Sequence, residues 1–194
     1  MWLGRRGARV LALFGLAAAL GAGAAFDAVS AVAAKVHSRA VVPCSLLKTS
    51  EVSAAVHYQV KTSNVPSTPA FVPGGLFVTC NFVEAHPANI DNGARVVSLA
   101  VIQRDYSKKP ATWTASAASK QFAHIKSFEA PVAVVHGLGD GAVWSPAIGA
   151  LYVLSGDIVF EISGNTSQRT TGSKQAEASE SVDIGLMRKA LART

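Results

Sequence analysis

The chain has 194 residues, of which 49% are hydrophobic and 15% charged, a composition that suits one folded domain and not a disordered protein. Its formal net charge is +6, but Arg5, Arg6 and Arg9 supply three of these charges close to the start. The remaining basic residues are scattered along the sequence. Nucleic-acid binding needs a clustered basic surface, so we expect no nucleic-acid partner.

The first residues have the three parts of a secretory signal peptide. Residues 1–9 are basic and free of acids, residues 10–20 are apolar, and a stretch of Gly and Ala follows. Ala22-Gly23-Ala24 fits the cleavage pattern, which predicts a signal peptide over residues 1–24. A second candidate cleavage motif lies at residues 29–31.

The two cysteines, Cys44 and Cys80, both lie in the part that would be exported. An even pair in an oxidising compartment predicts a disulfide. Such a bond would close a loop of roughly 36 residues and stabilise the fold by about 4 kcal/mol. The alternative is a pair of buried free thiols.

The first half of the exported part predicts a linker, a helix and two strands. Residues 25–42 are rich in Ala and predict a linker, followed by a single exported domain over residues 43–192. Thr49 is expected to cap a short helix with apolar spacing at Val52, Ala55 and Val56. Residues 61–75, with their prolines and glycines, predict a loop. Alternation predicts strands over 76–84 and 95–105, joined through the turn signal Asn92-Gly93.

The second half predicts a helix, further strands and a last helix. Thr112 or Thr114 is expected to cap the first of these helices. Strands are expected over residues 132–136, 150–154 and 158–162, with a continuation through Val143 and Trp144, and the last helix is expected to end near Ala192. Strand–helix–strand crossovers do not repeat regularly. The fold class predicted is therefore α+β, an antiparallel sheet of about five strands with helices packed on one face and one disulfide.

Residues 136–142 (HGLGDGA) match a dinucleotide-binding fingerprint when written G-x-G-x-x-A. That function needs a helix directly after the glycines, because the helix N-terminus holds the pyrophosphate. Pro146 and Gly149 oppose such a helix, so we expect no cofactor. We expect instead a structural turn, with positive φ at glycines and an aspartate that caps amides, formed by Gly137, Gly139, Asp140 and Gly141.

No metal or catalytic residues are predicted. The five histidines lack the spacing of a metal motif, and a G-x-S-x-G nucleophile elbow is absent from the sequence. Three acidic residues are expected at strand edges: Glu84, Glu129 and Glu161. Trp113 and Trp144 are expected in the core.

Three short segments carry a further signal: the opening Pro43–Val52 (PCSLLKTSEV), the second cysteine with its aromatic neighbour (Cys80-Asn81-Phe82) and the turn 137–142 (GLGDGA). Together they resemble a family of small bacterial exported proteins of unknown function. Related proteins are envelope lipoproteins or extracellular sensor domains of receptor kinases. The resemblance implies a Cys44–Cys80 disulfide, an α+β domain and no catalytic role. The sequence departs from the family in Lys48, in Phe82 where Trp is usual, and in lacking a lipidation cysteine.

These observations predict an exported, non-enzymatic binding or sensing module of the bacterial envelope, secreted or periplasmic. Its partner would be an unknown small molecule or an envelope protein. One alternative is a secreted, hydrolase-like enzyme with a site assembled around His136 and Asp140. Another is a structural envelope protein held by an uncleaved membrane anchor over residues 10–26, a length near the lower limit for spanning a bilayer.

Overall fold

The computed structural model describes residues 36–63, 70–72, 75–87, 94–107, 112–164 and 173–194. They belong to one compact unit that begins at Ala33. The predicted signal peptide and the Asn92-Gly93 turn lie outside the described residues. No helix formed by the described residues is long and apolar enough to cross a membrane.

The described chain forms helices, two of which begin at residues with capping hydrogen bonds. Their bounds are α1 Pro43–Leu46, α2 Thr49–Val56, α3 Ala115–Phe128 and α4 Ser173–Leu191. The Thr114 hydroxyl accepts the Ala117 amide at 3.2 Å and caps α3, as one of the two predicted caps. Lys48, not Thr49, occupies the capping position of α2, and the Glu51 carboxylate accepts its amide at 2.9 Å. The predicted cap of this helix was therefore wrong by one residue.

All strand pairs of the described residues are antiparallel. The strands are β1 Val60–Thr62, β2 Ala70–Val72, β3 Gly75–Glu84, β4 Val96–Arg104, β5 Ala133–Val135, β6 Gly141–Ser145, β7 Ala150–Ser155 and β8 Ile158–Gly164. Seven of them follow one another in the order β1-β3-β4-β8-β7-β6-β5, and β2 pairs with β3 beside this path. The antiparallel sheet is confirmed, but the expectation of about five strands was too low.

The undercount has a physical reason. Residues 61–75 were expected to be a loop, yet β1 and β2 lie within or beside this range and pair with opposite ends of β3. Each of these strands has three residues, too few to show the period-two alternation by which a strand is recognised.

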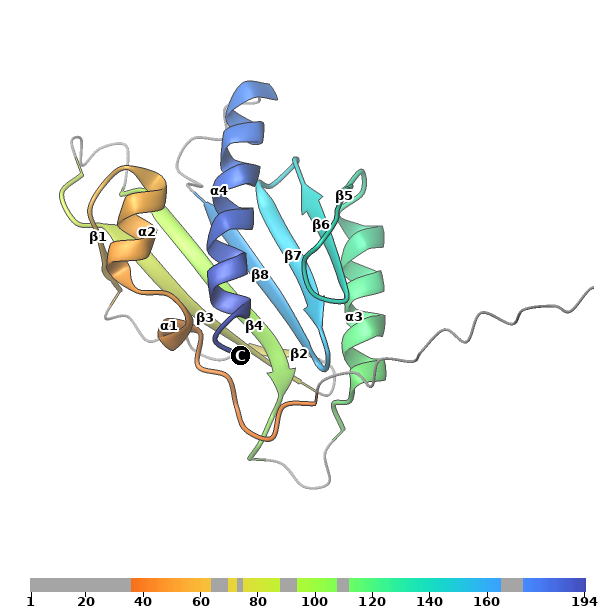
Figure 1. The fold of residues 1–194 in the computed structure, drawn as a ribbon. Helices are drawn as coiled ribbons and strands as arrows, with labels where there is room; N and C mark the ends of the chain where they lie inside the picture. Colours follow the sequence, from red (N-terminus) through yellow and green to blue (C-terminus); the bar gives the residue numbers. More distant parts are fainter. Residues whose placement is uncertain (1–35, 64–69, 73–74, 88–93, 108–111, 165–172) are drawn as a thin grey trace, which may run out of the picture. The chain divides into compact units, whose positions relative to one another are not determined.

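Helices cover both faces of the sheet, which corrects the expectation that they pack on one face. Phe160 and Ile162 of β8 share a core cluster with Leu186 and Met187 of α4, and this cluster also includes α1 and α2 residues. Val159, between Ile158 and Phe160, instead packs with Phe122 of α3 in a second cluster. Figure 1 shows α2 and α4 in front of the strands and α3 on the other side, beside β5 and β6. Trp113 and Trp144 are buried, as predicted.

Candidate functional site

The segment Val36–Val42, here called the strap, is fixed to one end of the sheet by a buried glutamine. Gln103 at the end of β4 is 2% exposed. Its side-chain oxygen accepts the Val41 amide at 2.7 Å, and its side-chain nitrogen donates to the Val41 carbonyl at 2.8 Å. The amide side chain thus pairs with the strap as a neighbouring strand would. This end of the predicted linker over residues 25–42 is part of the folded body.

A histidine–aspartate pair fixes the other end of the strap. His37 Nδ1 lies 2.7 Å from Asp157 Oδ1, and the His37 backbone amide donates to the same oxygen at 3.1 Å. Tyr106 donates to the His37 carbonyl, and Trp113 Nε1 donates to the Asp157 carbonyl at 2.6 Å. His37 Nε2 is buried without a hydrogen-bond partner among the described residues. The pair therefore holds the strap and is not joined to a nucleophile in the part of the chain described.

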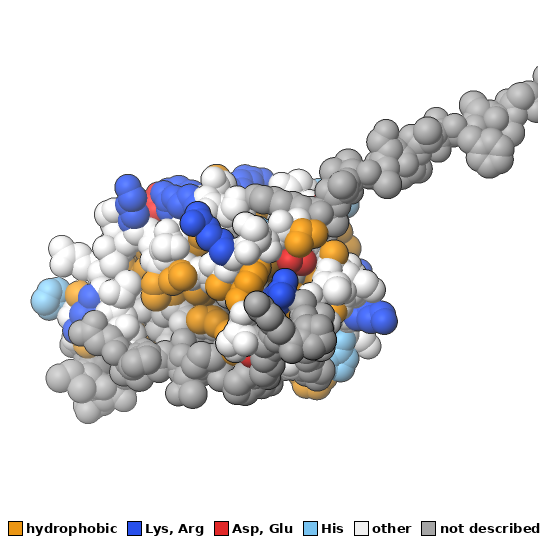
Figure 2. Space-filling view, turned by 90° about the horizontal axis from the view of Figure 1, so that it is seen from below, with side chains coloured by type: hydrophobic (Ala, Val, Ile, Leu, Met, Phe, Trp, Pro, Cys, Tyr) orange, Lys and Arg blue, Asp and Glu red, His pale blue; other side chains and the backbone are white. Residues whose placement is uncertain are grey.

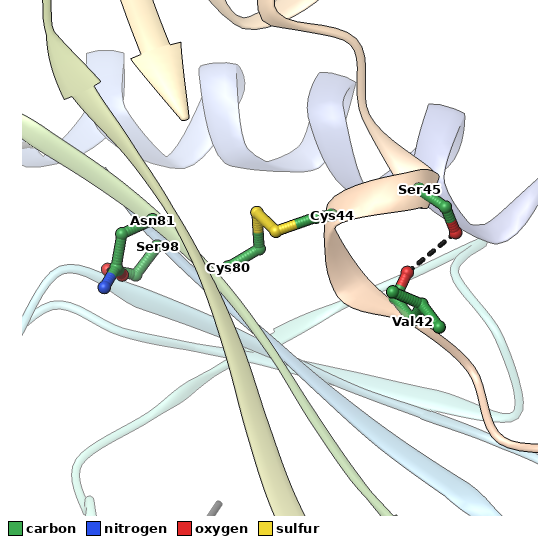
Figure 3. The surroundings of a disulfide bond; sticks show 6 residues. All are labelled: Val42, Cys44, Ser45, Cys80, Asn81 and Ser98. Atoms are coloured by element: carbon green, nitrogen blue, oxygen red, sulfur yellow. Dashed lines mark hydrogen bonds between the residues drawn. A yellow bond between two sulfur atoms is a disulfide. The ribbon is translucent and has the colours of Figure 1, made fainter. Parts of the chain in front are cut away.

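The disulfide joins α1, the helix that directly follows the strap, to the sheet. Cys44 in α1 is bonded to Cys80 in β3, with the two Cα atoms 5.1 Å apart, so the predicted pairing is confirmed. Cys80 is buried, whereas Cys44 is exposed. Figure 3 shows the bond between α1 and β3, with Asn81 and Ser98 on the opposite side of that strand. Hydrogen bonds thus hold both ends of the strap, and the disulfide holds the helix that follows it.

The strap, α1 and the C-terminal end of the chain enclose a hollow of about 490 Å³, here called the end hollow. Val36 and Val42 on its wall are exposed by 71% and 59%. Its wall also contains Arg39 and Arg193. Figure 2 shows this end of the molecule, with apolar side chains at the centre and Lys and Arg side chains towards one border. The end hollow combines apolar contact with positive charge.

Arg193 is held in place by Glu51 of α2. The guanidinium makes two bonds of 2.7 Å to the Glu51 carboxylate and donates to the Leu46 carbonyl at 2.6 Å. Arg193, and next the Lys48 amide, lower the pKa of Glu51 to about 2. Arg193 is therefore neutralised by its partner, while no hydrogen bond or ion pair is found for Arg39 within the described structure. Arg39 is the available positive charge of the end hollow.

Glycines with positive φ and an aspartate that accepts a backbone amide fix the predicted turn between β5 and β6. Gly137 and Gly139 have φ values of 76° and 52°, and a side chain on Gly139 would clash with the Leu154 carbonyl oxygen. The Asp140 carboxylate accepts the Gly156 amide at 2.6 Å. Gly141 is the first residue of β6. His136 and Asp140 are both exposed and neither lines the end hollow.

A second group of polar side chains lies on the face of the sheet that carries α3. We call Glu129, Ser145, Tyr152 and Glu161 the acid–tyrosine cluster. Tyr152 of β7 and Glu161 of β8 are register partners, and the Ser145 hydroxyl lies 3.4 Å from Glu129 Oε2. Burial, and then the nearby Glu129 charge, raise the pKa of Glu161 to about 7. Burial also raises the pKa of Tyr152, with smaller contributions from Glu161 and Glu129.

The acidic residues do not lie where the sequence placed them. Glu161 is in a central strand, Glu129 follows the last residue of α3, and Glu84 is buried in an ion pair with Arg95 at 2.6 Å. The expectation of three strand-edge acids was therefore wrong for Glu161 and Glu129. The alternation of β8 did place Glu161 on the face opposite Phe160. It could not show that α3 packs on this face.

Comparison of the chain with protein-family models, curated proteins and solved structures finds no significant match. The resemblance to exported bacterial proteins therefore remains a prediction based on its three motifs.

Proposed function

We propose that the protein is an exported, non-enzymatic binding or sensing module of the bacterial envelope, with its ligand site in the end hollow. The observation that carries the proposal is a hollow large enough for a small molecule, in which exposed valines lie beside an arginine that has no ion-pair partner among the described residues. A ligand that joins an apolar body to one acidic group would satisfy both features. The disulfide supports an oxidising compartment.

Two alternatives have different requirements. An enzyme built around His136 and Asp140 would need a third polar group and a pocket near them. Instead both residues are exposed, and the Asp140 carboxylate is engaged by the Gly156 amide. A structural protein held by residues 10–26 would depend on retention of that segment, and firm association of the full-length chain with membranes would favour it.

The binding proposal is tested with 8-anilinonaphthalene-1-sulfonate, a fluorescent probe that joins an apolar ring system to a sulfonate. The protein is recovered from a bacterium that expresses the full chain. We expect the probe to gain fluorescence and Arg39→Glu to weaken its binding about tenfold, the scale of one charge-assisted hydrogen bond. The matched control is Lys120→Glu, a charge reversal on the exposed side of α3, which should leave binding unchanged.

Two results contradict the proposal. Equal probe affinity in the Arg39→Glu and Lys120→Glu proteins would show that the end hollow is not the site. Turnover of any member of a panel of ester, peptide, glycoside and phosphate substrates by the purified protein would support the enzyme alternative instead.

A further inference from the structure

Basic side chains lie beside the end hollow without lining it. Lys48 is close to Arg193, because the Glu51 carboxylate accepts the Lys48 amide at 2.9 Å and also binds the Arg193 guanidinium. Lys189 precedes Arg193 by four residues at the end of α4, so the two are neighbours along one side of this helical end. Lys48 and Lys189 are both exposed. With Arg39 on the strap, they give this end of the described chain three exposed basic side chains.

These three charges have little opposing charge beside them. No ion pair of the described residues involves Arg39, Lys48 or Lys189. Glu51 is already neutralised in its own ion pair, and no Asp or Glu of the described residues lines the end hollow. The carboxylate of the last residue, Thr194, lies on the wall of the hollow and offsets one of the three charges. The described part of this end therefore keeps a net positive charge.

Exposed valines lie beside the basic side chains. Val36 and Val42 are exposed by 71% and 59%, and both line the end hollow on either side of Arg39 in the strap. In Figure 2 the apolar side chains occupy the centre of this end, and Lys and Arg side chains lie towards one border. We call Val36, Arg39, Val42, Lys48 and Lys189 the end face.

An anionic phospholipid bilayer has the chemistry that matches the end face. Its headgroups carry negative charge, and an apolar region lies directly beneath them. Long basic side chains can keep their charges at the headgroups while neighbouring apolar side chains enter the acyl boundary. A second copy of the chain fits this face less well, because a two-fold contact through it would bring like charges together.

The order of the sequence also places the end face near a membrane during export. Val36 follows the apolar leader segment 10–26, with only residues 27–35 between them. A stretch of this length reaches little more than about 30 Å, at about 3.5 Å per residue. While the leader is in the bilayer, the end face is therefore the described part of the chain that is joined to it most directly.

We propose that the end face docks on the surface of an anionic phospholipid bilayer. The basic side chains attract the headgroups, and the two valines contact the apolar boundary below them. Docking of this kind is distinct from ligand binding inside the end hollow, because Lys48 and Lys189 do not line the hollow. Either activity can therefore be present without the other.

The experiment is sedimentation of the protein with vesicles of phosphatidylglycerol and phosphatidylcholine, with pure phosphatidylcholine vesicles for comparison. The protein is recovered from a bacterium that expresses the full chain. We expect binding to the mixed vesicles and much weaker binding to the neutral ones. Raising the NaCl concentration from about 0.1 M to about 1 M should release the protein, because the screening length falls from about 10 Å to about 3 Å.

Paired substitutions locate the docking surface. Lys48→Gln/Lys189→Gln should weaken binding to the mixed vesicles about 25-fold, at about fivefold for each lost charge. The matched control, Lys120→Gln/Lys126→Gln, removes the same charge from exposed positions on α3 and should bind like the unchanged protein. All four positions are exposed, so we expect both double variants to unfold in urea like the unchanged protein.

Three results would each overturn the docking proposal: no binding to the mixed vesicles, equal binding to mixed and neutral vesicles, or equal losses of binding in the two double variants. Equal binding to both kinds of vesicle would indicate attachment through residues 10–26 instead. Absence of vesicle binding together with a doubled mass in light scattering would assign the end face to a second copy. The fluorescent-probe test of the end hollow uses Arg39→Glu, so its failure is distinguishable from any of these results.

Discussion

Two buried polar residues, Gln103 and His37, hold the strap against the sheet. Gln103 is 2% exposed, and the oxygen and the nitrogen of its side chain both form hydrogen bonds with Val41. Its burial therefore costs little free energy while the strap stays in place. If the side chain is removed, the Val41 amide and carbonyl lose their partners in a half-buried setting. The strap in turn forms much of the wall of the end hollow. One glutamine therefore contributes to both stability and the proposed site.

Gln103→Ala should lower the free energy of unfolding by about 1–3 kcal/mol, the cost of unpaired buried polar groups. The measurement is urea unfolding followed by fluorescence, with amide hydrogen exchange at Val41 as a local readout. Gln121→Ala, a partly buried position on α3, is the matched control and should change stability by no more than about 0.5 kcal/mol. Similar losses in the two variants would show that the Val41 bonds do not hold the strap.

At the level of elements, α4 is attached to the sheet by a buried stripe that contains one acid. Leu186, Met187 and Ala190 are each at most 1% exposed, and Asp183, one turn earlier, is 0% exposed. Neither Asp183 oxygen has a hydrogen-bond partner within the described residues. Gly164 at the end of β8 lies so close that a methyl group there would be 3.1 Å from Asp183 Oδ1. Burial raises the pKa of Asp183 well above its usual value, and the Gly164 backbone offsets part of the effect.

Asp183 should make the protein less stable as the pH rises. The folded state retains the proton to a higher pH than the unfolded chain, so no penalty exists below the unfolded pKa near 4 and the penalty grows above it. Asp183→Asn removes the titration, and its stability relative to the unchanged protein should increase between pH 4 and pH 7. Urea midpoints at several pH values measure this difference. Glu180→Gln is the control on the same helix, and an Asp183→Asn curve parallel to that of the unchanged protein would contradict the argument.

The elements that the sequence predicts well are those with long, clean periodicity. β3, β4 and β8 alternate over 10, 9 and 7 residues, and their predicted ranges agree with the structure to within two residues. β1 and β2 were missed because three residues carry no measurable period. The faces covered by helices were also missed, because Val159 and Phe160 are both apolar and alternation alone does not say which helix lies on which side.

The candidate sites depend on contacts between residues far apart in the sequence. Gln103 and Val41 are separated by 62 positions, and His37 and Asp157 by 120. No local pattern distinguishes such a histidine or glutamine from an exposed one. The Cys44–Cys80 pair was predictable because compartment and cysteine count together left few choices. The acid–tyrosine cluster left one signal, an acid inside an otherwise apolar central strand.

At the scale of the whole molecule, the disulfide links α1, which follows the strap, to β3, the second strand in the order of the sheet. It spans 36 positions, and α1 contacts β3, β4 and α4. In the unfolded chain the same bond restricts the conformations available to this long segment. The covalent link therefore stabilises the arrangement of elements that surrounds the end hollow.

Reduction of the disulfide should lower the free energy of unfolding by about 2–4 kcal/mol. The measurement is urea unfolding with and without dithiothreitol. The double variant Cys44→Ala/Cys80→Ala should show the lower stability in both conditions and no response to the reductant. An unchanged urea midpoint on reduction of the bond would contradict the stabilising role.

The central claim, export into an oxidising compartment, is tested most directly by the intact mass of the protein. The full 194-residue chain is expressed in a bacterium and recovered from the periplasmic and extracellular fractions. We predict a mass that lacks residues 1–24 and is lower by the two hydrogens lost when Cys44 and Cys80 join. Recovery of the full-length chain from the cytosol with both thiols reduced would contradict the claim and the function proposed from it.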